Sequence, residues 1–484
     1  MTPDAVVLAA PAIPAAGAVA IALLGARPNL REAATLASAA ALFLAVLSLL
    51  GPVLDGARPG AVLMEILPGV ALAFRVEPLG MLFALVASGL WIVNSVYSIG
   101  YMRGNGESHQ TRFYVCFALA LASTMGIAFS ANLLTLFIFY EALTLITYPL
   151  VTHHGDYEAR RGGRTYLGVL LGTSILLLLP AIAVTWAVAG TLDFVPGGIL
   201  GRGMSNSAIG GLLALYVFGI GKAALMPFHR WLPAAMVAPT PVSALLHAVA
   251  VVKAGVFSVV KVIVYVFGIE EIAGLKSVDW LPFVSGFTII AASIVALRSD
   301  NLKRRLAYST VSQLSYVVLS VSLLAPLSVM GAALHIVAHA VSKITLFFAA
   351  GAIYTASHKT EVSQLDGIGL RMPWTMGAFT VGALSLIGVP PAVGFVSKWF
   401  IFQGAAATGQ YLVMTVLGAS ALLNAAYFLP IVYAAFFRTP PQDAGHGEAP
   451  LPMVLALLAT AALTVGLFFY PDIPLALARQ LAGS

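Results

Sequence analysis

The sequence predicts an all-α membrane protein that crosses the bilayer about fourteen times. Of its 484 residues, 60% are hydrophobic and only 9% are charged, whereas charged residues make up roughly a quarter of a soluble domain. Lipid offers backbone groups no hydrogen-bond partner, so each span must be a helix or part of a closed barrel, and apolar runs of about 20 residues indicate helices.

Fourteen apolar stretches follow one another along the chain. The first has no basic region before it and is followed by many others, so we expect a retained helix rather than a cleaved signal peptide. The predicted spans are 5–25, 33–53, 76–99, 112–130, 132–151, 164–189, 207–227, 239–268, 280–297, 301–323, 327–356, 373–403, 410–437 and 451–471.

The basic residues predict the orientation of these spans. Fifteen of the 25 lysines and arginines lie in or at the edges of the odd-numbered loops, and five lie in the even-numbered loops and the C-terminal tail. Basic residues favour cytoplasmic loops. We therefore expect a multi-pass protein of the bacterial inner membrane with both termini on the periplasmic or extracellular side.

Several function classes are excluded by the same composition. The net charge of +6 follows the loop rule, so we expect no nucleic-acid partner. The single cysteine, Cys116, rules out a disulfide within the chain and a cysteine-ligated iron–sulfur cluster. Gly219-Ile-Gly221-Lys222 lacks the remaining residues of a phosphate-binding loop. No loop exceeds about twenty residues, so we expect no catalytic chemistry and no bound cofactor in this chain.

Ionisable residues inside the predicted spans are the main functional signal. A charge near the bilayer centre costs roughly 2.5–3.5 kcal/mol, so such residues face protein or water and mark ion paths. Lys261 lies about two turns from the end of its span, and there we favour a side chain that snorkels to the interface. The other ionisable residues inside the spans are Glu141, Lys222, Lys253, Lys343 and Lys398. Any one of these lysines could also be a structural counter-charge for Glu141, which lies in the middle of its span.

One predicted helix carries a polar stripe. His335, His339 and Lys343 are spaced at i, i+4 and i+8 and therefore share a face. Two histidines at this spacing could bind a metal, but no carboxylate or cysteine in the span completes a ligand set, so we expect no metal site. A proton relay fits better, because histidine changes charge near neutral pH. Core histidines bonded between helices remain the alternative.

Two further histidine sites lie nearer the helix ends. His153-His154 stands at a cytoplasmic helix end beside Asp156 and Glu158, where we expect a solvated or proton-collecting face. His229 follows the seventh span on the cytoplasmic side, and we assign it no relay role. His247 shares an apolar stretch with Lys253 and is included in the predicted proton pathway.

Two predicted spans are interrupted in the same way. Pro227 and Pro233 follow Lys222, and the run Gly388-Val-Pro-Pro-Ala-Val-Gly394 precedes Lys398. Such breaks are tolerated in a membrane when they are buried in protein or line a water-filled cavity, and paired breaks indicate inverted repeats. The broken span is the fourth in each of two series of five. We therefore predict N-terminal helices at 1-111, inverted repeats at 112-268 and 279-437, and a last helix within 438-484.

Six motifs follow one another along the chain. They are Phe139-Tyr-Glu141, Gly221-Lys222-x4-Pro227-x3-Trp231-Leu-x3-Met236, Pro239-Thr-Pro-Val-Ser-Ala-Leu-Leu-His247, Asp300-Asn-Leu-Lys-Arg-Arg-Leu-Ala-Tyr308-Ser-Thr-Val-Ser-Gln313, His339-x3-Lys343 and Gly388-Val-Pro-Pro391-x2-Gly394-Phe-x2-Lys398. Together they resemble the antiporter-like subunits shared by respiratory complex I, Mrp-type multisubunit cation/proton antiporters and membrane-bound hydrogenases. The resemblance covers essentially helices three to thirteen.

The resemblance implies fourteen helices and a row of ionisable residues along the membrane plane. It implies that Glu141 and Lys222 are the paired residues of a first half-channel and that Lys253 bridges the halves. His335, His339 and Lys343 would form the relay of the eleventh helix, and Lys398 would end the second half-channel.

Details of the sequence bear on the host complex. The stretch from Arg371 to Met376 together with Lys253 is similar to the D-type Mrp subunit, whereas His335 resembles the relay of the largest complex I subunit. Within this family, we expect neither the long lateral helix of the largest complex I subunit nor the extended tail of the largest Mrp subunit.

The leading hypothesis is a proton-translocating subunit of an Mrp-type monovalent cation/proton antiporter. It implies other membrane subunits as partners within the lipid bilayer, and protons with a monovalent cation as substrates. A carboxylate near a buried lysine stabilises the ammonium, so movement of Glu141 would switch Lys222 between holding and releasing a proton. The alternatives are the pump subunit of a complex I-like or hydrogenase-like redox translocase, and a non-conducting scaffold with structural lysines.

Overall fold

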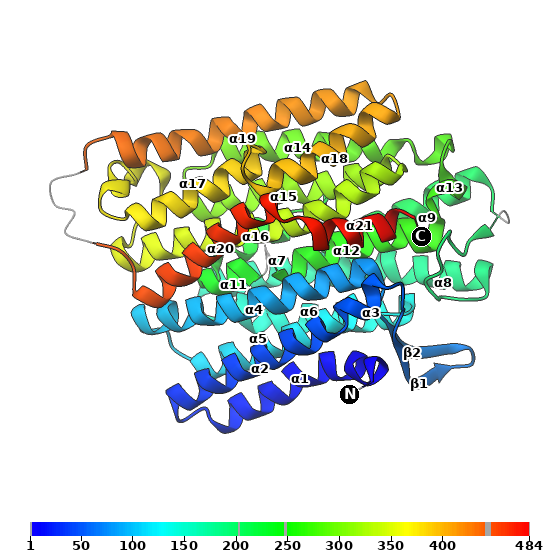
Figure 1. Cartoon of the computed structure of the whole chain (residues 1–484), viewed down its shortest axis with the longest axis horizontal. Helices are drawn as coiled ribbons and strands as arrows, with labels where there is room; N and C mark the ends of the chain where they lie inside the picture. The colour runs from blue at the N-terminus through cyan, green and yellow to red at the C-terminus, as the bar shows by residue number, and fades with distance from the viewer. Residues whose placement is uncertain (1, 202–203, 246–248, 441–446, 484) are drawn as a thin grey trace.

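The computed structural model describes residues 2–201, 204–245, 249–440 and 447–483. Long helices run side by side along one direction and form a single bundle (Figure 1). The helices of the first six predicted spans are α1 (Pro3–Leu23), α2 (Pro28–Ser48) with α3 (Leu50–Leu54), α4 (Pro78–Gly104), α5 (Gln110–Ala128), α6 (Leu133–Val151) and α7 (Tyr157–Thr173) with α8 (Leu179–Ala189).

The remaining predicted spans are also helical. They contain α9 (Asn206–Gly219), α11 (Thr240–Ala244) with α12 (Val251–Val262), α14 (Trp280–Arg298), α15 (Leu302–Ser322), α16 (Pro326–Ser357), α17 (Pro373–Ile387) with α18 (Val393–Ala407), α19 (Tyr411–Phe437) and α20 (Leu451–Phe469). Among the described residues, ten helices are long and apolar enough to cross a membrane, and shorter apolar helices accompany them. The prediction of an all-α membrane fold is confirmed.

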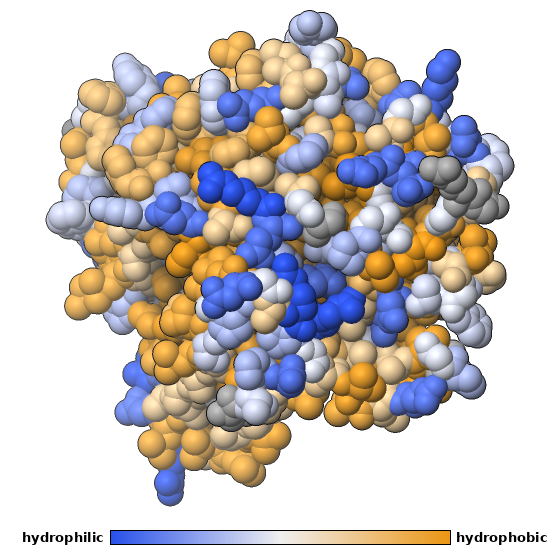
Figure 2. Space-filling model, turned by 45° about the vertical axis from the view of Figure 1, so that its right-hand side comes forward, coloured by the Kyte–Doolittle hydropathy of each residue, from blue (hydrophilic) through white to orange (hydrophobic). Residues whose placement is uncertain are grey.

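The outer surface of the bundle has the character that a membrane requires. Figure 2 shows hydrophobic side chains over much of the visible face, around a limited area where hydrophilic side chains gather. Several large apolar side chains are well exposed, among them Leu176, Leu422 and Phe437. Because lipid tails are as apolar as these side chains, their exposure fits a surface that contacts lipid.

Helix α16 lies at the centre of the bundle. Its most apolar 18-residue window is buried completely, and the helix packs against neighbours from both halves of the sequence, which are α4, α11, α12, α15, α17, α18, α20 and α21. A helix of this kind is apolar around its circumference because no face meets solvent. The polar groups that it carries must therefore find partners inside the protein.

Both predicted helix breaks are present. The first follows Gly219, where a 3₁₀ turn at Gly221–Ala223 leads into irregular chain before the short helix α10 (Trp231–Ala234). The second separates α17 from α18 at residues 388–392. At the first break, the Trp231 indole N–H donates to the carbonyl of Gly221 over 2.9 Å. Such side-chain bonds satisfy backbone groups that the interruption leaves unpaired. The proposed repeat boundaries remain a prediction.

A hairpin and a C-terminal helix lie outside the predicted spans, as do the short helices α10 and α13 (Ile269–Ile272). A β-hairpin pairs β1 (Gly60–Leu67) with β2 (Val70–Arg75) in antiparallel register, around Gly69 at φ +76°. Helix α21 (Asp472–Ala482) follows α20 and buries Leu477 and Leu481. The Pro68-Gly69 dipeptide between two apolar runs was an available hairpin signal.

The bundle has two distinct ends. The hairpin lies at one end, on the side toward which both chain termini lie in Figure 1; we call this the hairpin end. The opposite end holds the last turn of α4 and the first turns of α5 and α15, with Arg103, Arg112 and Arg304; we call it the basic end.

Candidate proton pathway

The predicted stripe on α16 is the centre of a buried polar chain. His335 and His339 are almost fully buried, and their rings lie 6.3 Å apart, nearly parallel. His339 Nδ1 lies 2.5 Å from Lys253 Nζ, which reaches it from α12. The structure thus brings together two of the predicted site residues, and the contact links the lysine of α12 directly to the stripe.

His335 connects the stripe to two other helices. Its Nδ1 lies 2.9 Å from Ser397 Oγ on α18, and its Nε2 lies 3.1 Å from Gln313 Oε1 on α15. The ring also stacks on Tyr316 with a centroid distance of 5.4 Å. Both ring nitrogens are engaged, which orients the imidazole and leaves it able to accept and donate at opposite edges.

Lys343 joins the same chain through neutral residues. Its ammonium donates to Ser309 Oγ over 2.9 Å, and the Tyr427 hydroxyl donates to that oxygen over 3.0 Å. Tyr427 also bonds Asn424, whose Oδ1 lies 3.5 Å from Gln313 Nε2. Polar side chains therefore lead from Lys343 to Gln313, the residue that bonds His335.

Four of these residues were not among the predicted site residues. Ser309 and Gln313 belong to a motif that carried the family resemblance, and Asn424 and Tyr427 lie in a strongly apolar span. An asparagine in such a span was a usable signal, because polar groups in lipid-spanning helices seek partners on other helices. The sequence does not show which side chain on another helix each of these residues bonds, and the structure does.

Lys398 is the last residue of the buried polar chain and lies at the second helix break. Its ammonium donates to the carbonyls of Leu386 and Ile387 over 2.6 and 3.1 Å. These carbonyls belong to the last turn of α17, where no further helical N–H is available. The ammonium also lies 4.8 Å from the ring centroid of Tyr316, the ring that stacks on His335. Lys398 is half-buried, unlike the lysines of the interior.

Lys222 occupies the corresponding position at the first break. Its ammonium is fully buried and donates to the carbonyl of Tyr140 over 2.8 Å and to Thr144 Oγ1 over 2.5 Å. Its nitrogen also lies 3.2 Å from the centroid of the Tyr140 ring. Helix α6 therefore supplies only neutral oxygen acceptors and an aromatic ring to this ammonium.

Glu141 follows Tyr140 on the same helix but does not bind Lys222 directly. Within the described part of the chain, Glu141 forms no ion pair within 4.0 Å, and its buried Oε1 has no hydrogen-bond partner. The carboxylate lies beside the α6 residues that hold Lys222 without touching the ammonium. The paired role of the two residues stays a prediction that requires the carboxylate to change position.

Helix α12 packs directly on the first break. A Cβ atom added at Gly255 would lie 2.2 Å from the carbonyl carbon of Lys222, so only glycine allows this approach. Lys253 lies on the same helix half a turn earlier. The backbone that positions Lys222 is thus in contact with the helix that positions Lys253. His247 lies outside the described residues.

Lys261 differs from its predicted arrangement. We expected it to snorkel to the interface, but its side chain is fully buried, with Nζ 3.3 Å from Glu77 Oε2, and it donates to the carbonyl of Ser130 over 2.6 Å. The segment at 195–199 bonds the carbonyls of Tyr265 and Val266 and covers this helix end. Glu77, at the start of α4, is a buried carboxylate that sequence reasoning missed beside Arg75.

A small cluster at the basic end also differs from expectation. The side chain of His153 is not solvated (0% exposed), whereas that of His154 is 40% exposed, and both lie within 3.8 Å of Glu107 Oε2. Burial lowers the pKa of His153 to about 4 and raises the pKa of Glu107. His153 is therefore neutral at physiological pH. Glu107 and His154 line a cavity of about 230 Å³ with Lys303 and Lys359.

The shifted pKa of His153 predicts a pH-dependent stability. The unfolded chain binds a proton at His153 below its ordinary pKa of 6.5, but the folded chain does so only near 4, so stability falls as the pH falls through this window. The substitution of His153 leaves its charged neighbours unchanged. They are Arg112, which donates to the His153 carbonyl, together with Glu107 and Lys303. We expect His153→Phe to flatten the thermal-unfolding profile between pH 6.5 and 4. His154→Phe should leave it unchanged, and an unaltered slope in His153→Phe would contradict the assignment.

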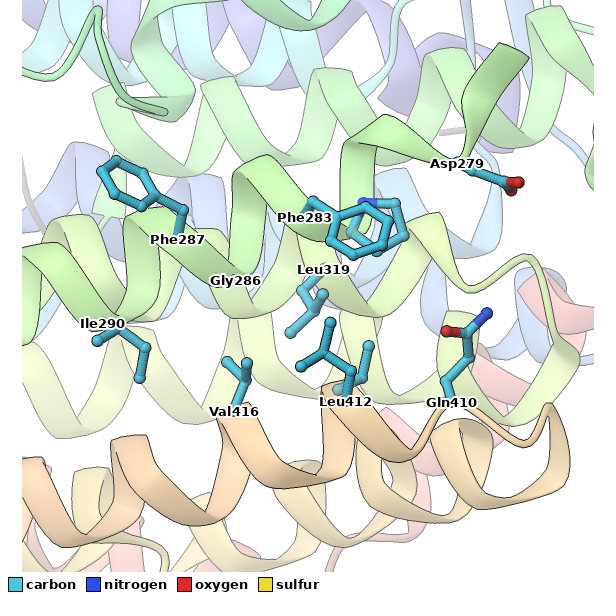
Figure 3. A pocket seen from close by; sticks show the side chains of 11 residues that line it. Asp279, Phe283, Gly286, Phe287, Ile290, Leu319, Gln410, Leu412 and Val416 are labelled. Atoms are coloured by element: carbon cyan, nitrogen blue, oxygen red, sulfur yellow. The ribbon is translucent and has the colours of Figure 1, made fainter. Parts of the chain in front are cut away.

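A further groove does not belong to the polar chain. It has a volume of about 470 Å³ and lies between α14 and α19. Phe283 and Phe287 come from one side and Leu412 and Val416 from the other, while Asp279 and Gln410 lie at the same end of the groove on opposite sides (Figure 3). The apolar walls offer no group that could carry a proton. Among the described residues, no group of three histidines, cysteines or carboxylates could hold a metal ion.

Comparison with known proteins places this arrangement in a family. A family model described as "NADH:quinone oxidoreductase/Mrp antiporter, TM" matches residues 130–423. The protein named "NADH-quinone oxidoreductase subunit N" from Desulforudis audaxviator is 34% identical over 383 residues, which are 78% of this chain and 75% of that protein. A protein of Rhizobium meliloti, named as the probable A/B component of a K(+)/H(+) antiporter, is 32% identical over 82% of this chain, although the chain covers only 40% of that protein.

Solved structures show the same fold. A chain in the structure of the Mrp complex from Dietzia sp. DQ12-45-1b aligns with a TM-score of 0.89 at 22% identity and covers 100% of this chain and 97% of that chain. A chain of the archaeal membrane-bound sulfane sulfur reductase aligns with a TM-score of 0.86 at 22% identity and covers 99% and 97%. The matched family region includes the polar chain from Glu141 to Lys398, and the protein belongs to the NADH:quinone oxidoreductase/Mrp antiporter transmembrane family.

Proposed function

We propose that this chain is a proton-translocating subunit of an Mrp-type monovalent cation/proton antiporter. The observation that carries the proposal is the polar chain that runs across the bundle from Lys253 through His339 and His335 to the second break at Lys398. Lys253 bonds His339, and the His339 ring stacks on the His335 ring. The Tyr316 ring contacts both His335 and Lys398. Ionisable groups inside membrane-spanning helices are costly and usually mark an ion path.

The proposed pathway has a switch at each break. Glu141 stabilises the Lys222 ammonium when its carboxylate approaches and favours proton release when it moves away. The proton then passes to Lys253, through the stripe on α16, and to Lys398. Lys343 and its neutral partners form a side branch whose charge influences His335. His247 is included in this pathway because it belongs to the motif at 239–247, which precedes Lys253 in the sequence.

The proposal includes an orientation and partners. The arginines of the basic end support a cytoplasmic location for that end in a bacterial inner membrane, with the hairpin end outside. The cavity lined by Glu107 and His154 would then open toward the cytoplasm. The similar chains with solved structures belong to multisubunit complexes, which supports a hetero-oligomer with other membrane subunits. Assignment to the D-type position in an Mrp complex rests on the sequence from Arg371 to Met376.

A second candidate has specific support. The 34% identity to a chain named for NADH-quinone oxidoreductase favours a pump subunit of a redox-driven translocase. The two candidates share the proton pathway but differ in partners. Purification of the native complex through a tag on this chain distinguishes them, because flavin or iron–sulfur absorbance in the complex supports the redox translocase and its absence supports the antiporter.

The pathway itself is tested by His339→Phe. The phenyl ring keeps the shape of the side chain but cannot pass a proton between Lys253 and His335. We expect proton transport by the reconstituted complex to fall by about tenfold or more, with the complex still assembled. His229→Phe is the matched control, because that ring lies beside Tyr308 near the basic end. Wild-type transport in His339→Phe would contradict the pathway and favour a core histidine.

A further inference from the structure

The buried group at the hairpin end contains more charge than packing requires. Glu77 lies 3.6 Å from Arg75 and 3.3 Å from Lys261. The side chains of Glu77 and Lys261 are 6% and 0% exposed, whereas that of Arg75 is 36% exposed. A buried ion pair is often no more stabilising than well-packed apolar residues, and this one adds a second cation. The group therefore calls for a functional explanation.

This group borders an open cleft. The cleft has a volume of about 770 Å³ and is lined by Arg75 and Glu77 together with Asp55, Arg58, Tyr265 and Gln480. Asp55 and Arg58 are exposed, so the cleft reaches the surface at the hairpin end. Glu77 thus lies between this cleft on one side and the buried Lys261 ammonium on the other.

Only one of the two cations can change its charge. An arginine keeps its proton in proteins, whereas a buried lysine can release one. Arg75 therefore balances the Glu77 carboxylate permanently, and the net charge of the group changes with the Lys261 proton. Arg75 is held in place by the carbonyl of Phe194, which accepts a hydrogen bond from it.

Lys261 also shares a face of α12 with the main pathway. Lys253, Phe257 and Lys261 are spaced at i, i+4 and i+8, about 12 Å from end to end at the rise of an α-helix. Lys261 Nζ lies 5.5 Å from the centroid of the Phe257 ring, and that ring packs on Phe83 with a centroid distance of 5.0 Å. On this helix face, an aromatic pair is what separates the two lysines.

We propose that Glu77 and Lys261 form a second proton-binding site, which is reached from the cleft at the hairpin end and exchanges protons with Lys253 when the Phe83–Phe257 pair opens. The Lys261 ammonium loses a proton as its N–H bond breaks, and the Glu77 carboxylate gains it as an O–H bond forms. Glu77 then passes the proton to water in the cleft, and no electrons are transferred. This inference rests on the proposed proton transport and adds a separate access route to it.

Two variants separate proton carriage from a structural counter-charge. Lys261→Arg keeps the positive charge but cannot release a proton, and Glu77→Gln combined with Lys261→Met removes both charges. The complex is purified through a tag on this chain and reconstituted in liposomes. We expect both variants to assemble and to lose proton transport by about tenfold or more. Wild-type transport in either variant would overturn the proposal.

A third variant decides the matter if those complexes do not assemble. Phe257→Leu leaves every charged group in place and weakens the aromatic barrier. We expect it to raise the passive proton leak through the complex several-fold, measured with a pH-sensitive dye after an imposed pH gradient. An unchanged leak would overturn the proposal.

The proposed function is tested separately in the same preparation. His339→Phe lies on the main pathway and outside the Glu77–Lys261 site. If His339→Phe loses transport and the Lys261 variants do not, only the second site is wrong. If none of these variants changes transport, the main pathway is wrong as well.

Discussion

Replacement of Lys222 by methionine is expected to abolish proton transport while the complex remains assembled. The fully buried ammonium donates to the carbonyl of Tyr140 and the hydroxyl of Thr144, and no carboxylate of the described chain lies within 4.0 Å of it. Methionine has a similar length and keeps the packing, but it carries no proton. Transport measured by pH-gradient-driven exchange in liposomes should fall to the background of empty vesicles.

The stability of this variant discriminates between roles. Loss of one partner from a buried ion pair costs about 3–5 kcal/mol, whereas replacing a buried charge that has no counter-charge by an apolar group removes the free-energy cost of burying that charge. Because Lys222 has only neutral partners, we expect an unchanged or higher unfolding temperature in Lys222→Met. A large decrease would identify Lys222 as a structural counter-charge for Glu141. Lys276→Met, at an exposed position, is the matched control.

Replacement of Gly394 by alanine is expected to destabilise the second break strongly. The added Cβ would lie 1.8 Å from the carbonyl oxygen of Ser385, and the Gly394 N–H donates to Ser385 Oγ over 3.0 Å. Backbone of α17 occupies the space, so the two half-helices must separate. Overpacking costs typically about 1–3 kcal/mol and more when backbone must move, so we expect about 3 kcal/mol or more.

The measurement is the amount of chain in the membrane and the unfolding temperature of the purified complex. Gly418→Ala provides the matched control, because a Cβ there meets no atom within 4 Å in the interior of α19. Helix propensity makes that change neutral or stabilising by up to about 1 kcal/mol. Equal levels and equal unfolding temperatures in the two variants would contradict the packing argument.

Most of the fold could be predicted because its signals are local. Apolar runs locate the helices, and the prolines and glycines around Pro227 and Pro390 locate the breaks, since proline removes a backbone donor. The hairpin at 60–75 lies outside the predicted elements because its two apolar runs are too short for a membrane-spanning helix. Its signals were the Pro68-Gly69 turn and short runs on either side.

The site was predictable only in part, for a physical reason. A lysine such as Lys343 is conspicuous in an apolar helix because an isolated charge is costly there. Neutral polar residues such as Ser309 and Tyr427 carry little penalty, so only the structure reveals the hydrogen bond that joins them from α15 to α19. Lys261 was misplaced because its distance from a helix end says nothing about what covers that end.

The burial of α16 also has a consequence for the order of synthesis. Translation proceeds from the N-terminus, so Lys253 and Gln313 are synthesised before His335 and His339. Ser397, the remaining partner of His335, arrives more than sixty residues later. The contacts of α16 with α4, α11, α12 and α15 can therefore form before α17, α18, α20 and α21, which cover the rest of its surface, are synthesised. Until those helices are made, the polar residues of α16 must be kept from lipid by the part of the bundle that has already been synthesised.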